Sequence, residues 1–202
     1  MASEPPDTVD FYFDFASPYA YFAHGAIGEL AQRHGLRLRR HPVLLWAILK
    51  ELGMPTPMEH PAKSRYLRQD MERSAAHYGL PFRLSPRFPF STHAAARLYY
   101  AVEAQQPERC GAIATVLFEA CFAQARDISD AAVLAELAAP LGYTAEQAQQ
   151  AIEGETGKAA LREANGTAAV RGVWGSPYWF WGDEAFFGAD RLPQFERLLR
   201  RA

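Results

Sequence analysis

Ser17 and Pro18 are the first residues in this 202-residue chain whose types and spacing could do chemistry. Serine is favoured as a helix N-cap and proline at the first helical position, so the pair predicts a helix start. A helix N-terminus presents unpaired N–H groups and about half a positive charge, which stabilises an anion such as a thiolate. The Ser17 hydroxyl could therefore donate a hydrogen bond to a thiolate carried by a substrate or cofactor. The plainer alternative is a helix cap without a chemical role.

Ser17 has no expected partner that would make its hydroxyl a nucleophile. His24 follows two helical turns later on the same side, but it lies about 10 Å further along the helix axis, beyond hydrogen-bond reach. His93 belongs to a distant segment, where a capping or solvated histidine is expected. Thiol–disulfide exchange is excluded here, because Ser17-Pro18-Tyr19-Ala20 contains no sulfur.

The two cysteines, Cys110 and Cys121, stand eleven residues apart in one helical pattern from about 107 to 123. Their Cα atoms would be roughly 16 Å apart, too far for a disulfide. Both fall on the apolar stripe of that helix, so we expect small buried hydrophobes. No Cys/His cluster has zinc spacing, and a metal site is not expected.

Composition places the chain among ordinary globular proteins, with 49% hydrophobic and 22% charged residues and a net charge of −2. The sequence has no basic stripe of the kind that would indicate a nucleic-acid partner. It also has no apolar run long enough to span a membrane. The first ten residues lack the basic start of a secretory signal. We expect a soluble cytoplasmic protein.

The first 45 residues read as strand, helix, strand. Residues 8–15 alternate apolar and polar side chains, the helix from Ser17 should stop at Gly35, and a second alternating segment lies within residues 36–45. The spacing suits a right-handed unit with parallel strands.

The middle of the chain is almost all helical pattern. Helices are predicted at 63–77, from Ser91 or Thr92 to about 104, at 107–123, at 129–139 with Ser129 as cap, at 144–153 with a Thr144–Gln147 capping box, and at 156–170.

Strand character returns only at the end, where residues 178–181 and 185–187 flank a turn and predict a hairpin. Asp190 should cap a last helix over 191–201. This order predicts an α/β protein with a thioredoxin-like fold. Residues 1–45 and 170–202 would form the thioredoxin-like domain, and 46–169 an all-helical domain inserted after the second strand.

Gly172 to Pro177 forms a second candidate functional segment, because a proline that enters a strand after a glycine-containing turn is a candidate cis-proline. An ordinary trans-proline at a strand start is the alternative. In a thioredoxin fold this loop faces the first helix and offers its backbone to an extended peptide. Together the two segments predict a site for a small peptide that bears a thiol.

Four spaced segments carry a resemblance to a known family. They are Val9 to Tyr21 (VDFYFDFASPYAY), Lys63 to Met71 (KSRYLRQDM), Gly172 to Pro177 (GVWGSP) and Phe187 to Leu192 (FGADRL). In this order they resemble the signatures of the 2-hydroxychromene-2-carboxylate isomerases and kappa-class glutathione transferases, which have a DsbA-like thioredoxin fold. The resemblance covers nearly the whole chain and implies glutathione as cofactor and a homodimer.

The resemblance also implies roles for individual residues. Ser17 would be the catalytic residue facing the glutathione sulfur, with Pro18, Tyr19 and Pro177 beside it. Ser176 would pair through its backbone with the glutathione cysteine. Ala189 and Asp190 would hold the γ-glutamyl end, with Asp190 on the ammonium group.

Two positions depart from the family pattern. Ser176 stands where valine is usual, a change that leaves backbone pairing intact. Ala189 stands where serine or asparagine is usual, and the lost side-chain donor would weaken glutathione binding by roughly 0.5–1.5 kcal/mol.

The leading function is a glutathione-dependent isomerase that interconverts 2-hydroxychromene-2-carboxylate and trans-o-hydroxybenzylidenepyruvate in aromatic, naphthalene-type catabolism. The alternatives are a glutathione transferase that conjugates small electrophiles and a catalytically inactive thioredoxin-fold interaction module. Candidates for an apolar substrate wall, each of which could instead be core, are Trp46, Phe88, Phe90, Trp174 and Trp179. Candidates for the substrate carboxylate, each of which could instead be a solvated surface residue, are Lys50, Lys63 and Arg87.

Overall fold

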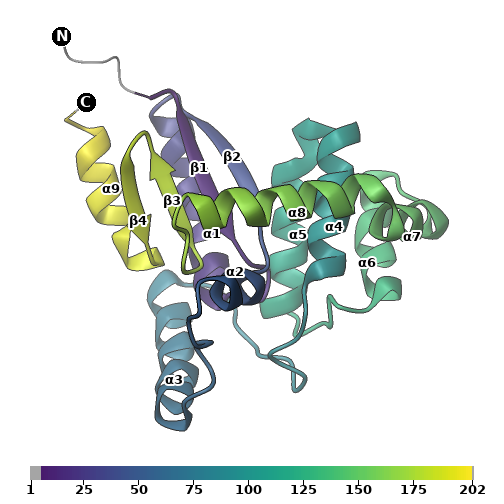
Figure 1. Cartoon of the computed structure of the whole chain (residues 1–202), viewed down its shortest axis with the longest axis horizontal. Coiled ribbons are helices and arrows are strands. Elements are labelled where there is room, and N and C mark those ends of the chain that lie inside the picture. The colour runs from purple at the N-terminus through teal and green to yellow at the C-terminus, as the bar shows by residue number, and fades with distance from the viewer. Residues whose placement is uncertain (1–5, 202) are drawn as a thin grey trace.

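A computed structural model describes residues 6–201 and has a four-stranded sheet near its centre (Figure 1). The strand order is β2-β1-β3-β4. The strands are β1 (Thr8–Phe13), β2 (Arg37–Pro42), β3 (Tyr178–Trp181) and β4 (Glu184–Phe187). β1 runs parallel to β2 and antiparallel to β3, so the sheet joins the two ends of the chain. These pairings confirm the predicted thioredoxin-like order of elements.

β1 is the central strand, and its side chains alternate between two covered faces. Val9 and Phe11 lie opposite Trp181 and Trp179 of β3 and are fully buried. On this face Phe13 contacts His24 of helix α1 (Pro18–Arg33), and Phe195 of helix α9 (Leu192–Leu199) contacts the Trp179 ring. Helix α8 (Glu155–Val170) crosses the other face (Figure 1).

Helix α1 starts and stops where the sequence predicts. The Ser17 Oγ accepts a hydrogen bond from the Ala20 N–H at 3.2 Å, which is a side-chain N-cap. Gly35, which follows the helix, has a φ of 66°, a left-handed conformation that glycine adopts without a steric penalty.

Seven helices and two short 3₁₀ turns separate β2 from β3. The helices are α2 (Leu45–Glu51), α3 (Pro61–Tyr78), α4 (His93–Gln105), α5 (Cys110–Phe122), α6 (Ala131–Ala138), α7 (Ala145–Glu153) and α8. The 3₁₀ turns are Pro107–Arg109 and Ala139–Leu141. The sequence pattern did not separate α2 from its surroundings. Among the helices of residues 6–201, none is both long and apolar enough to cross a membrane.

Besides the Ser17 cap, the capping box at Thr144 is confirmed, whereas the predicted side-chain caps at Ser129, at Asp190 and at Ser91 or Thr92 do not form. Asp130, not Ser129, caps α6, with its carboxylate accepting from the Ala132 N–H. Asp190 does not cap α9, because it lies inside a 3₁₀ turn (Ala189–Arg191) that precedes that helix. The Thr144–Gln147 capping box of α7 is present in full.

The cysteines behave as predicted from their spacing. Cys110 and Cys121 are both free and both buried in α5. Burial raises the pKa of Cys110 to about 11 and raises that of Cys121 further above its ordinary value. Neither thiol is a nucleophile at neutral pH.

Asp10 ties three parts of the fold together on the α8 side of the sheet. Its carboxylate accepts hydrogen bonds from Arg39 at 2.8 Å, His41 at 3.0 Å and Arg171 at 2.8 Å. The Arg171 guanidinium also lies 4.0 Å from the centre of the Phe180 ring. Burial raises the pKa of Asp10, but the hydrogen bonds from His41, Arg171 and Arg39 outweigh it and hold the pKa well below 3.8.

We predict that Asp10→Asn lowers the free energy of unfolding at pH 7 by about 2 kcal/mol, because hydrogen bonds to a buried charge are lost. A carboxyl whose pKa is lower in the folded than in the unfolded protein stabilises the fold at pH values above its unfolded pKa. This contribution is lost as the pH falls from the unfolded pKa towards the folded pKa. The difference between the two proteins should therefore shrink below pH 3.8. Urea unfolding at several pH values measures it. A difference that does not change between pH 7 and pH 3 would contradict the role of the Asp10 charge.

Candidate active site

The Ser17 hydroxyl lies against the loop that precedes β3. Its Oγ donates to the Ser176 carbonyl at 2.8 Å, although the two residues are 159 positions apart in sequence. The Ser176–Pro177 peptide is cis, as the sequence predicted. The structure thus brings together the two segments in which we expected the chemistry.

The Ser17 hydroxyl has one proton, and in this structure that proton is directed to the Ser176 carbonyl. Its oxygen accepts the Ala20 N–H at the same time. A thiolate that arrives at the start of α1 would compete with the carbonyl for the proton. Rotation of the hydroxyl towards the sulfur would leave the Ser176 carbonyl free to accept an N–H from the same ligand.

Ser17 and Ser176 border a cavity of about 360 Å³. Its lining is mostly apolar: Leu45, Trp46, Leu49, Met54, Pro55, Pro57, Met58, Leu67, Met71, Phe88, Pro89, Trp174 and Phe187, with Ala16, Pro18, Tyr19 and Gly175 beside the two serines. Lys63 is the single basic residue and Asp14 the single acidic one among the described residues that line it. Such a cavity suits an apolar molecule, and Lys63 could meet a negatively charged group of it.

Most of the predicted site residues meet here. Ser17, Pro18, Tyr19 and Ser176 line the cavity, and so do the substrate-side candidates Trp46, Lys63, Phe88 and Trp174. The Tyr19 hydroxyl donates to the Asp70 carboxylate at 2.7 Å and so fastens α1 to α3. Burial and Asp70 both raise the Tyr19 pKa, so this phenol stays protonated.

Other candidates lie outside the cavity. Lys50 is exposed and does not line it, and Arg87 is paired with Asp127 at 2.6 Å. Trp179 is fully buried and stacks on Phe186, so it belongs to the core.

Phe90 lines an adjoining hollow of about 390 Å³ that shares Asp14, Trp46 and Pro89 with the main cavity. It is therefore a neighbour of the cavity and not part of its wall.

Ala189 and Asp190, the residues predicted to hold the γ-glutamyl end of glutathione, lie next to the cis-proline loop. The Gly188 N–H donates to the Pro177 carbonyl at 3.1 Å, which places the turn of Ala189 and Asp190 beside that loop. Ala189 is buried. Asp190 is exposed, and its carboxylate lies 3.2 Å from Arg191.

The two histidines near the site are not bases for Ser17. His24 is buried, and its Nε2 lies 3.0 Å from the Thr115 Oγ1 on α5. Burial, together with the charge of Arg40, lowers the His24 pKa to about 3. His93 is exposed and contacts the Ser91 hydroxyl.

Asp14 is a site residue that the sequence analysis missed. It is buried at the end of β1, and its carboxylate accepts from Ala16 N–H, Leu45 N–H and the Thr92 hydroxyl. Burial raises its pKa above the ordinary value, although these hydrogen bonds act in the opposite direction. A charged residue three positions before Ser17, at the end of a buried strand, was the available signal.

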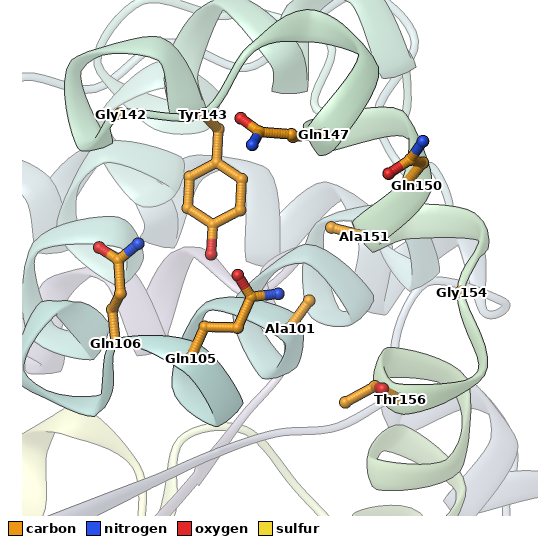
Figure 2. A pocket seen from close by; sticks show the side chains of 10 residues that line it. All are labelled: Ala101, Gln105, Gln106, Gly142, Tyr143, Gln147, Gln150, Ala151, Gly154 and Thr156. Atoms are coloured by element: carbon orange, nitrogen blue, oxygen red, sulfur yellow. The ribbon is translucent and has the colours of Figure 1, made fainter.

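A separate hollow of about 310 Å³ lies between α4, α7 and α8 (Figure 2). Figure 2 shows the Tyr143 side chain directed between Gln105 and Gln106, and Gln147 and Gln150 also line the hollow. It shares no residue with the Ser17 cavity, and its described lining has no charged side chain. This hollow therefore contains none of the predicted site residues.

Comparison with known proteins agrees with this geometry. The family model of the DSBA-like thioredoxin domain matches residues 8–200. A 2-hydroxychromene-2-carboxylate isomerase from Sphingobium xenophagum is 30% identical over 194 residues, which are 95% of this chain and 97% of that protein. The chain belongs to this DsbA-like family.

Two further members of the family are similar over nearly their whole length. Glutathione S-transferase kappa 1 from Rattus norvegicus is 25% identical and aligns over 96% of this chain and 91% of that protein. A solved structure of a 2-hydroxychromene-2-carboxylate isomerase superimposes with a TM-score of 0.85 at 28% identity, covering 96% of this chain and 95% of the other. The fold and family predicted from the sequence are confirmed.

Ser176, a position where this DsbA-like protein departs from the family pattern, has a structural role of its own. Its Oγ accepts the main-chain N–H of Asp14 at 2.9 Å, and it is 7% exposed. The hydroxyl thereby fastens the cis-proline loop to the end of β1.

We predict that Ser176→Val lowers the free energy of unfolding by roughly 1–3 kcal/mol, because the buried Asp14 N–H loses its acceptor. Ser176→Thr keeps an acceptor and should stay close to the wild type. Thermal or urea unfolding of both variants provides the comparison. Equal stability of the valine and threonine variants would show that this hydrogen bond contributes nothing.

Proposed function

We propose that this protein is a glutathione-dependent isomerase that acts on a conjugated aromatic keto acid, of the 2-hydroxychromene-2-carboxylate type. The observation that carries the proposal is the Ser17 hydroxyl, which stands at the start of α1, faces the Ser176 carbonyl, and opens into an apolar cavity. No cysteine lines that cavity in residues 6–201, so the thiol would come from outside the protein. The homodimer that the resemblance implies belongs to the same proposal.

The residues of this chain fit glutathione. The Ser176 carbonyl and the cis-proline loop offer main-chain groups to its cysteine, and the turn of Ala189 and Asp190 lies beside that loop for its γ-glutamyl end. The α1 N-terminus favours a negatively charged sulfur. The missing side-chain donor at Ala189 weakens this end of the site without removing the Asp190 carboxylate.

When bound, glutathione would supply a thiolate that adds reversibly to the conjugated substrate, which divides one difficult isomerisation into easier steps. The Ser17 hydroxyl would donate its hydrogen bond to the sulfur and hold it ionised. Lys63, at the cavity edge, would attract the substrate carboxylate. The side chains of Trp46, Phe88 and Trp174 would enclose the ring system and exclude water.

A glutathione transferase is the second candidate, and the similarity to the kappa 1 transferases favours it. The two functions differ in the fate of the thiol. An isomerase leaves the amount of free thiol unchanged after complete turnover, whereas a transferase consumes one thiol for each product. Titration of free thiol during the reaction of a conjugated keto acid distinguishes them.

We predict that bound glutathione ionises at a lower pH than free glutathione, and that Ser17→Ala removes part of this effect. The lost hydrogen bond to a charged sulfur is worth roughly 1.5–3 kcal/mol, which is about a ten- to hundredfold loss of rate. Ultraviolet titration of the thiolate and turnover of a conjugated keto acid measure the two effects. Full activity in folded Ser17→Ala protein would assign Ser17 to helix capping alone.

We predict that Lys63→Met raises the KM for an anionic substrate about two- to fivefold, since an exposed ion pair contributes about 0.5–1 kcal/mol. Lys50→Met is the matched control, because Lys50 is exposed and does not line the cavity. Steady-state kinetics with the carboxylate substrate and its methyl ester measure the effect. The ester should show no difference between the two variants. An equal effect of both substitutions would contradict the placement of Lys63.

A further inference from the structure

Asp14 makes hydrogen bonds to Ala16 and to three separate segments near the Ser17 cavity. Its carboxylate oxygens accept from the Ala16 N–H at 2.8 Å and from the Leu45 N–H at 2.9 Å. The Thr92 hydroxyl donates to it at 2.6 Å, and the Asp14 N–H donates to the Ser176 Oγ. Through these bonds, Asp14 connects the end of β1 with the first residue of α2, the residue before α4, and the cis-proline loop.

Thr92 occupies the position of a helix cap without acting as one. It precedes α4 directly, but its side chain makes no capping hydrogen bond to that helix. Its hydroxyl is directed to the Asp14 carboxylate instead. Thr144 is the opposite case, because it occupies the same position before α7 and accepts from the Gln147 N–H. The sequence predicts a cap at Thr144 and at either Ser91 or Thr92, and in the structure the Thr92 hydroxyl binds Asp14 instead.

Asp14 is held in place by hydrogen bonds. It has no ion-pair partner within residues 6–201, and burial raises its pKa. A carboxyl whose folded pKa is raised opposes folding at any pH at which it is ionised. Its ionised form has only acceptors, however, which matches the three donors around it. A buried carboxylate with every oxygen occupied by donors from separate segments is suited to fixing the position of those segments.

Two hydrogen-bond partners of Asp14, Leu45 and Thr92, belong to or directly follow segments that line the cavity. Leu45 is the first residue of α2, and Leu45, Trp46 and Leu49 of that helix line the cavity. Figure 1 shows α2 at the end of β1, where α1 begins. Thr92 follows the loop that supplies Phe88 and Pro89 to the same wall.

We propose that Asp14 is a positioning residue which, held by Thr92, fixes the α2 wall of the cavity relative to the Ser17 hydroxyl. Asp14 is not proposed to touch the reacting atoms. It would act through Leu45 and through the helix that follows, so that the ring system of the substrate is held against the thiol. The kinetic part of this proposal rests on the proposed function, and the structural part does not.

The test compares Thr92→Val with Thr144→Val, two isosteric substitutions at equivalent helix positions. Hydrogen–deuterium exchange measured by mass spectrometry reports on α2 and α7 separately. Thr92→Val should speed amide exchange in residues 45–51 and leave α7 unchanged, and Thr144→Val should do the reverse. Asp14→Asn should act like Thr92→Val, because its amide group places a donor against one of the N–H groups.

Kinetics supply a readout that a merely structural role would not change. With glutathione saturating, Thr92→Val should raise the KM for the conjugated keto acid roughly two- to tenfold, the range expected for one hydrogen bond. Glutathione affinity, measured by calorimetry, should not change. Thr144→Val should leave both quantities at the wild-type value, and Thr92→Ser should restore the KM.

A double variant decides whether the two residues act through one contact. If they do, Asp14→Asn combined with Thr92→Val should be no worse than Asp14→Asn alone. Wild-type exchange in α2 for both single variants would overturn the proposal. A wild-type protein that binds no glutathione would instead overturn the proposed function, and the exchange measurement would still decide the role of Asp14.

Discussion

The antiparallel pairing of β1 with β3 is the constraint on which the site depends. It sets Asp10 opposite Phe180 and Tyr12 opposite Tyr178, although these residues come from opposite ends of the chain. Because β1 leads directly into α1 and the cis-proline loop leads directly into β3, the register of this pair decides which residues meet. A shift of one residue would turn every side chain to the other face of the sheet. The contact of Ser17 with the Ser176 carbonyl exists only in the observed register.

The hydrogen-bond donors around Ser17 are neutral groups. They are the Ser17 hydroxyl and the start of α1, and Lys63 is the one basic residue among the described residues that line the cavity. The buried Asp14 carboxylate is close in sequence to Ser17, but its oxygens accept hydrogen bonds from three donors of the protein. The Asp14 carboxylate beside the Ser17 cavity is thus held by neutral donors.

The helices and loops between β2 and β3 supply most of the apolar lining of the Ser17 cavity. The open end of β1 would otherwise face solvent, and α2, the start of α3 and the 88–89 loop enclose it with apolar side chains. The Tyr19–Asp70 hydrogen bond holds α3 against α1, and the Asp14–Leu45 hydrogen bond holds α2 against β1. These connections unite the inserted helices with the sheet around one cavity.

The sequence alone determined the order of elements, the Ser17 cap, the cis-proline and the family, because each depends on local pattern or on a short motif. Alternating side chains predict β1, and the Thr144–Gln147 spacing predicts a capping box, whatever the rest of the chain does. Only the tertiary structure decided which lysine lines the cavity, that Trp179 is core, and that Thr92 donates to Asp14 while Asp130 caps α6. These outcomes depend on which distant segment lies opposite a side chain. A residue that can cap a helix can equally bind a buried carboxylate, and only the packed fold brings that carboxylate within reach.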